Sequence, residues 1–219
     1  MKYKAIIFDL DGTLVNSIED LADAMNTVLK SYNYPIHSYK AYEDFIGSGI
    51  RVLVQKALPP TENNDKQVTA CFDAMMLVYA NQCINKTRPY HGIIELLDIL
   101  KSRQLKLSVF SNKADELTKK VTLALLPNYF DSIDGLTIES HKKPNPIKAL
   151  QISKNLGIKP EDIIFVGDSG IDIQTANNAK MLAVGVSWGF KPKEELIAEG
   201  AKHVLNHPLE LIDILNTKQ

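Results

Sequence analysis

The sequence has few of the features that mark specialised protein classes. Its 219 residues include two cysteines and one tryptophan, and no apolar stretch is long enough to span a bilayer. Basic and acidic residues nearly balance, 25 against 26, and neither sign forms a long run. Because no basic or acidic patch is evident, we expect neither a nucleic acid nor a membrane as a partner.

A disulfide and a secretion signal are also missing from the pattern. Cys71 and Cys83 lie twelve positions apart in one predicted helix, which at about 1.5 Å per residue separates them by roughly 18 Å, too far for a disulfide. The apolar run at the amino terminus is interrupted by Asp9 and Asp11, unlike a signal peptide. We therefore expect a cytoplasmic location.

Nucleotide-binding motifs are missing as well. No Walker sequence occurs, and the glycines of Gly47-Ser-Gly49 do not follow a predicted strand, as a dinucleotide fingerprint requires. Hydrophobic residues make up 45% of the chain and charged residues 23%, which is ordinary for a globular protein with its own core.

Periodicity divides the chain into two parts. Residues 3–8 form an apolar run of strand length, and residues 17–84 then carry helical periodicity without a strand signal. After residue 89, helices alternate with strands predicted at 105–110, 135–138, 163–166 and 182–186. This pattern predicts an α/β fold, a doubly wound parallel sheet of residues 1–15 and 87–219, interrupted by a helical domain of residues 16–86.

Polar clusters follow the predicted strands, and functional groups of such sheets collect at this edge. The clusters are Asp9 and Asp11; Ser111 and Asn112; Lys143; and Asp168 with Asp172. Four acids in one crevice repel one another unless a cation neutralises them. Carboxylate oxygens suit Mg²⁺, whereas the histidines and cysteines show no zinc spacing, so we predict Mg²⁺ as the cofactor.

A metal surrounded by acids suits phosphoryl transfer. We assign Asp9 as the nucleophile and Asp11 as the general acid and base. Lys143 and Ser111 are predicted to contact the phosphoryl oxygens, and Asn112 is a further candidate for phosphate binding. The backbone amides around Gly12 form a predicted anion-binding nest. Each of these assignments has an alternative. Asp-x-Asp-Gly is a common turn sequence, Ser111 could serve as a helix cap and have no other role, and Lys142 could take the role assigned to Lys143.

Four segments together resemble the motifs of the haloacid dehalogenase superfamily. They are Asp9-Leu-Asp-Gly-Thr-Leu14, Ser111-Asn112, Lys143-Pro144 and Gly167-Asp-Ser-x-x-Asp172. The resemblance covers nearly the whole chain. It implies a Rossmann-like core, with Asp9, the Asp11 backbone carbonyl and Asp168 on Mg²⁺, Asp172 supporting the metal waters or Lys143, and the helical insert as a cap.

Further segments are similar to the phosphoglycolate phosphatase branch: Phe45-Ile-Gly-Ser-Gly49, Ser111-Asn-Lys113, Asp172-Ile-Gln-Thr-Ala176 and Trp188-Gly-Phe190. His91 and Lys180 depart from that branch, which often has proline and glycine there. On the insert, Gly47 and Arg51 are candidates for substrate binding, since an arginine can grip a carboxylate with two hydrogen bonds, although a solvated side chain is the commoner role.

We therefore expect a Mg²⁺-dependent phosphatase that hydrolyses a small phosphorylated metabolite through an aspartyl-phosphate, as a monomer or a weak homodimer. A phosphomutase of the same superfamily is one alternative. A phospho-aspartate receiver module is another, but it would have no helical insert after its first strand.

Overall fold

The computed structural model describes residues 2–47 and 49–217, and the chain divides into two compact units. The first unit, the core, comprises Met1–Val15 and Pro89–Gln219, and the second, the helical insert, comprises Asn16–Arg88. The short strands β2 (Val15–Asn16) and β3 (Arg88–Pro89) pair where the chain passes between the units.

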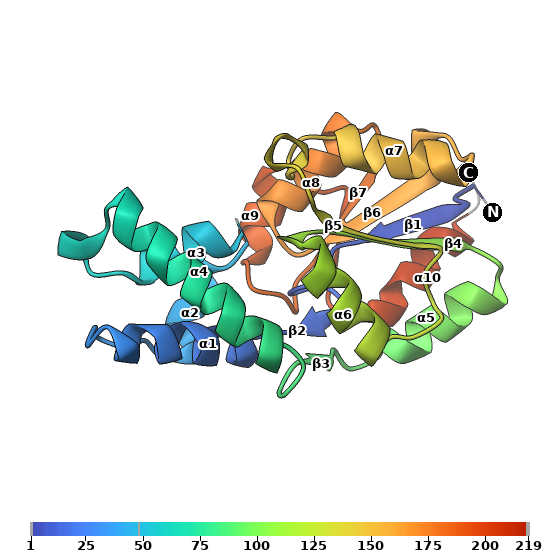
Figure 1. The fold of residues 1–219 in the computed structure, drawn as a ribbon. Helices are drawn as coiled ribbons and strands as arrows, with labels where there is room; N and C mark the ends of the chain where they lie inside the picture. The colour runs from blue at the N-terminus through green and yellow to red at the C-terminus, as the bar shows by residue number, and fades with distance from the viewer. Residues whose placement is uncertain (1, 48, 218–219) are drawn as a thin grey trace. The chain divides into compact units, whose positions relative to one another are not determined.

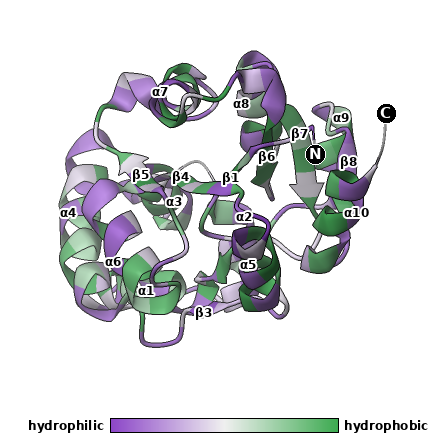
Figure 2. Ribbon diagram, turned by 90° about the vertical axis from the view of Figure 1, so that its right-hand side faces the viewer, coloured by the Kyte–Doolittle hydropathy of each residue, from purple (hydrophilic) through white to green (hydrophobic). Residues whose placement is uncertain are grey.

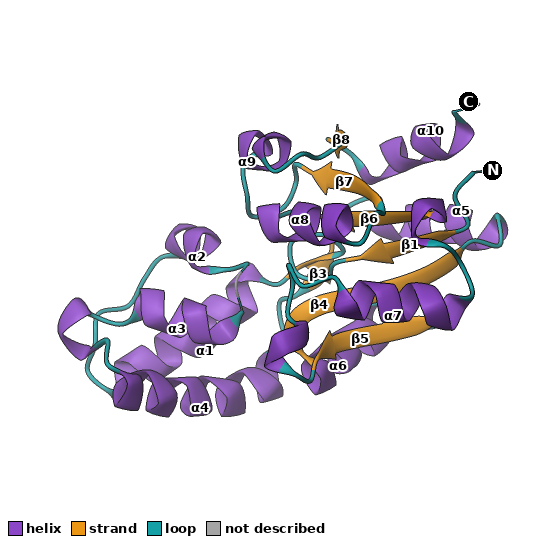
Figure 3. Ribbon diagram, turned by 90° about the horizontal axis from the view of Figure 1, so that it is seen from above, coloured by secondary structure: helices purple, strands orange, loops and turns teal. Residues whose placement is uncertain are grey.

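The core contains a six-stranded sheet in the order β5-β4-β1-β6-β7-β8 (Figures 1 and 3). Every neighbouring pair is parallel. The strands are β1 (Ala5–Phe8), β4 (Lys106–Ala114), β5 (Ser132–Leu136), β6 (Ile163–Gly167), β7 (Leu182–Val186) and β8 (His203–Leu205). The predicted α/β class with a doubly wound parallel sheet is confirmed.

Helices cover both faces of the sheet, with α7 and α8 on one face and α5, α6 and α10 on the other (Figures 1 and 2). The core helices are α5 (Ile93–Ser102), α6 (Asp115–Leu125), α7 (Ile147–Leu156), α8 (Gly170–Asn178), α9 (Lys193–Ala198) and α10 (Leu211–Asn216). On the face covered by α7 and α8, Ala5 and Ile7 pack with Phe165 and Ile173 in one hydrophobic cluster. Because helices cover both faces, the neighbouring strands β1 and β6 are apolar and buried along their length.

Two strands differ from the sequence prediction. Strand β4 continues through Ser111 to Ala114, so these polar residues lie within the strand and not after it. Strand β5 covers residues 132–136, earlier than predicted, because Asp131 anchors its start: its N–H donates to the Leu107 carbonyl, and its carboxylate accepts from the Leu107 N–H. Only the neighbouring strand supplies these contacts, so periodicity could not locate β5.

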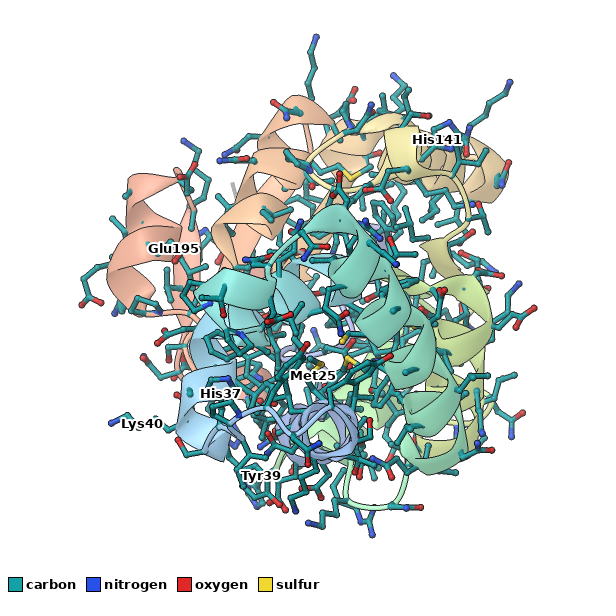
Figure 4. The ribbon with its side chains drawn as sticks, turned by 60° about the vertical axis from the view of Figure 1, so that its left-hand side comes forward. Met25, His37, Tyr39, Lys40, His141 and Glu195 are labelled. Carbon is teal, nitrogen blue, oxygen red and sulfur yellow. The ribbon has the colours of Figure 1, made fainter. Side chains whose placement is uncertain are left out.

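The insert is helical, as its periodicity predicts, with α1 (Ile18–Ser31), α2 (Tyr39–Phe45), α3 (Ile50–Ala57) and α4 (Asp65–Gln82). Its core includes Met25 and Tyr42, both fully buried. His37, labelled with Met25 in Figure 4, places Nε2 2.8 Å from the Ala57 carbonyl. Cys71 and Cys83 are buried, and neither is in a disulfide. Among the described residues, no helix combines the length and apolar character that crossing a membrane requires.

Asp20 is a buried acid in the insert whose role the sequence did not indicate. Its carboxylate accepts hydrogen bonds from the Lys86 N–H at 3.0 Å, the Thr87 N–H at 2.8 Å and the Thr87 hydroxyl at 2.7 Å. Asp20 and Thr87 are both buried. The carboxylate therefore ties the first helix of the insert to the segment in which the insert ends.

Candidate active site

Asp9 lies directly after β1 at the carboxyl edge of the sheet. Its N–H donates to the Val166 carbonyl at 2.9 Å, which continues the parallel pairing of β1 with β6 by one residue. The side chain is buried, and its Oδ1 lies 2.8 Å from the Lys143 ammonium. The structure thus brings together the predicted nucleophile and the predicted phosphate-binding lysine.

Lys143 is held in place through both its side chain and its backbone. Its ammonium lies 2.6 Å from Asp172 Oδ1 and above the ring of Phe110, at 5.5 Å from the centroid. The side-chain amide of Asn112 accepts from the Lys143 N–H at 2.8 Å and donates to the Lys143 carbonyl at 3.3 Å. Asn112, predicted to bind phosphate, therefore positions the lysine backbone. Lys142, the alternative, instead forms an ion pair with Glu139.

Asp172 stands in the first turn of α8 and is fully buried. Its Oδ2 accepts from the Ser169 N–H at 3.1 Å and from the Ser169 hydroxyl at 2.6 Å, forming a capping box at the helix start. The same helix end is satisfied by Glu195 of α9, labelled in Figure 4, which accepts from the Gly170 N–H at 3.1 Å. Both Asp172 oxygens thus already have protein donors, and the residue fixes Lys143.

Asp168 follows β6 and is oriented by two donors. The Thr13 hydroxyl donates to Oδ1 at 3.3 Å and the Phe190 N–H donates to Oδ2 at 2.8 Å. The backbone approaches closely at Gly12 and Gly189, where an added Cβ would overlap the Asp168 side chain. These contacts fix the orientation of the Asp168 carboxylate beside Asp9 and Asp172.

Ligand oxygens of Asp9, Asp168 and Asp172 all lie within 4.8 Å of one another, and all three residues are buried. An all-oxygen donor set of this kind suits a hard divalent cation. The residues therefore fit the predicted Mg²⁺, with Asp9 and Asp168 as the carboxylates best placed to hold it. The Asp11 side chain lies outside this group of acids, so any contact of Asp11 with the metal would be through the predicted backbone carbonyl.

Burial and crowding shift the ionisation of these groups. Burial, and then the charge of Asp172, raise the pKa of Asp9 to about 7, although Lys143 opposes the rise. Burial and the charges of Asp172 and Asp9 likewise raise the pKa of Asp168 well above its usual value. Burial alone would lower the pKa of Lys143, but Asp172 and Asp9 together raise it. Three acids share one lysine, so a second cation would relieve the repulsion among them.

The Asp11 side chain turns to a lysine that sequence reasoning did not assign to the site. Lys113 Nζ lies 2.7 Å from both Asp11 carboxylate oxygens. Ser111 is buried nearby on β4, and its hydroxyl accepts from the Lys113 N–H at 3.3 Å. The stretch Ser111-Asn-Lys113 carries a family resemblance, and its polar run at the end of a buried strand is the sequence signal that could have identified Lys113.

The Gly12 N–H donates to the Val15 carbonyl at 2.9 Å, and the anion-binding nest around this residue stays a prediction. With a φ of 87°, Gly12 supplies the turn and the space beside Asp168. On the insert, Gly47 and Gly49 adopt positive φ, whereas Ser48 between them lies outside the described residues. Arg51 donates to the Thr69 hydroxyl at 3.1 Å, and its predicted contact with substrate stays a prediction.

Several positioning contacts could not be read from the sequence. The Trp188 indole N–H donates to the Thr13 carbonyl at 3.0 Å, which ties the segment after β7 to the loop that carries Asp9 and Asp11. The structure shows that the tryptophan side chain and the Phe190 backbone hold the loop around Asp168.

Comparison with known proteins agrees with this geometry. The family model described as haloacid dehalogenase-like hydrolase matches residues 6–186. The phosphoglycolate phosphatase of Aquifex aeolicus (strain VF5) is 33% identical over 214 residues, which cover 97% of each chain. That of Haemophilus influenzae (strain ATCC 51907) is 31% identical over 98% of this chain and 99% of its own. The crystal structure of a predicted phosphoglycolate phosphatase from Haemophilus somnus 129pt has a TM-score of 0.91 at 28% identity and covers 99% of each chain.

Proposed function

The chain belongs to the haloacid dehalogenase-like hydrolase family, and from this premise we propose that it is a Mg²⁺-dependent phosphatase acting on a small phosphate monoester. The observation that carries the proposal is the buried arrangement of Asp9 with Lys143 at 2.8 Å and with Asp168 and Asp172 within 4.8 Å. A nucleophile, a cation for phosphoryl oxygens and a set of oxygen ligands meet there, as phosphoryl transfer requires.

In the proposed reaction, an Asp9 oxygen attacks phosphorus and the bond to the leaving oxygen breaks. Asp11 gives a proton to that oxygen and later accepts one from the water that hydrolyses the aspartyl-phosphate. Lys143 neutralises charge on the phosphoryl group. Asp172 holds the lysine ammonium, and the Asn112 side-chain amide holds the lysine backbone. When bound between Asp9 and Asp168, Mg²⁺ would supply further positive charge to the phosphoryl oxygens.

The substrate we propose is a compact metabolite of the phosphoglycolate type. Its support is the sequence similarity to phosphoglycolate phosphatases over 97% of the chain. The helical insert, which we infer acts as a cap that limits substrate size, supports the same class. Arg51 is the insert residue we propose for a substrate carboxylate, and a cytoplasmic location stays a prediction.

Release of inorganic phosphate from a panel of phosphorylated metabolites tests this function. We expect 2-phosphoglycolate to be among the best substrates, activity to disappear with chelator, and Mg²⁺ to restore it. The same panel separates the phosphomutase alternative, which would isomerise a sugar phosphate with little release of phosphate. If no compound of a broad panel is hydrolysed in the presence of Mg²⁺, the proposed function is wrong.

A further inference from the structure

Lys113 is a buried cation that the reaction described above does not use. Its side chain is 2% exposed, and Nζ lies 2.7 Å from both oxygens of Asp11, whose side chain is 15% exposed. A buried ammonium requires a charged or polar partner, and two short contacts fix the plane of the carboxylate as well as its position. The lysine thus holds the Asp11 carboxylate while part of it stays accessible.

The backbone of Lys113 is itself fixed. Its N–H donates to the Ser111 hydroxyl at 3.3 Å, and its carbonyl accepts from the Thr118 hydroxyl at 3.0 Å. The residue also stands in β4, the strand next to β1, which leads to Asp11. The ammonium is therefore carried on a rigid element and needs little reorganisation to meet its partner.

We propose that Lys113 is a positioning residue for Asp11, holding its carboxyl group in the orientation used for proton transfer. The inference rests on the proposed function. It adds Lys113 to the residues of the reaction, because its ammonium lies beside the Asp11 carboxyl group. That group changes charge when the aspartyl-phosphate forms and again when it is hydrolysed.

The bonds and charges show why a cation is useful at this position. In the first half, the bond from phosphorus to Asp9 forms and the bond to the leaving oxygen breaks, and its electron pair stays on that oxygen, which takes the proton from Asp11. Asp11 becomes negative as the proton leaves, directly beside the Lys113 ammonium. In the second half, a water proton passes to Asp11, the water oxygen bonds to phosphorus, and the electron pair of the Asp9–phosphorus bond returns to Asp9.

The leaving group provides a readout that a purely structural role would not move. An alkyl phosphate releases an alkoxide, which needs a proton, whereas p-nitrophenyl phosphate releases a stable phenolate. For Lys113→Met we expect kcat/KM on the best alkyl phosphate of the panel to fall on the order of 100-fold, with a loss within about fivefold on p-nitrophenyl phosphate. Equal losses on both compounds, or no loss on either, would overturn the inference.

Lys119→Met is the matched control. Lys119 makes an ion pair of the same length, 2.7 Å, with Asp115 on the core, but its side chain is 52% exposed. We expect this variant to hydrolyse both compounds like the parent. A selective loss on the alkyl phosphate in Lys119→Met would show that the readout responds to any lost lysine charge, and the inference would fail.

A second comparison covers the case in which Lys113→Met does not fold because Asp11 is left without its partner. The Asp11→Asn variant has no carboxylate at position 11 that would be left without a partner. Adding Lys113→Met to it should not lower activity further, since the lysine acts through Asp11. A further loss in the double variant contradicts the inference. A parent inactive on the whole panel instead refutes the proposed function, so the two failures are distinguishable.

Discussion

Replacing Asp9 by asparagine is expected to abolish turnover and, without metal, to stabilise the core at alkaline pH. The amide keeps the shape of the side chain but loses the nucleophile. Burial raises the pKa of Asp9 from 3.8 to about 7. Because each pKa unit corresponds to about 1.4 kcal/mol, holding this group ionised in the folded core costs up to about 4 kcal/mol, and the asparagine removes that cost.

The pH dependence has a defined sign. The pKa of Asp9 is higher in the folded protein than in the unfolded chain, so its stabilising contribution is complete below about pH 4 and is lost as pH rises through about 7. The asparagine side chain of the variant does not titrate, so Asp9→Asn should flatten this part of the profile. Lys143 keeps a partner in the variant, because Asp172 lies 2.6 Å from its ammonium.

Urea unfolding in the presence of chelator measures the effect. Trp188 is the only tryptophan of the chain and belongs to the core, so its fluorescence reports unfolding of that unit. We expect Asp9→Asn to exceed the parent in unfolding free energy at about pH 9, with a smaller difference at about pH 5. Asp73→Asn, an exposed acid of α4, is the control and should change neither value. A variant less stable than the parent at alkaline pH, or one with turnover near the parent's, would refute the reasoning.

Two further predictions concern positioning contacts. Asp20→Ala leaves the buried N–H and hydroxyl of Thr87 without their acceptor, so thermal or urea unfolding of the insert should show a loss of about 3 kcal/mol or more. The control Asp23→Ala, which removes an exposed ion pair, should cost less than about 1 kcal/mol, and equal losses in the two variants would refute the role of burial. In Gly189→Ala, the added Cβ overlaps the Asp168 side chain, so Mn²⁺ affinity measured by electron paramagnetic resonance should fall about 10–100-fold. Unchanged Mn²⁺ affinity would show that this loop does not orient Asp168.

The sequence by itself determined the fold class and drew attention to the residues at the strand ends. Alternating helices and apolar strands indicate a parallel sheet with two covered faces, and such a sheet brings the carboxyl ends of β1, β5 and β6 to one edge. Asp9, Lys143 and Asp168 could therefore be proposed together although they are far apart in the chain. Short segments were sufficient for both predictions, because the periodicity of apolar residues and the polar residues that follow a strand can each be read within a few positions of the chain.

Only the tertiary structure decided which partner each polar side chain meets. Asn112 binds the backbone of Lys143, Lys113 binds Asp11, and Asp20 accepts from Thr87. Each pair joins residues separated by tens of positions or more, so no periodicity carries the information. These contacts exist because burial removes water from polar groups, and each group must then find a partner among whatever neighbours the packed chain supplies.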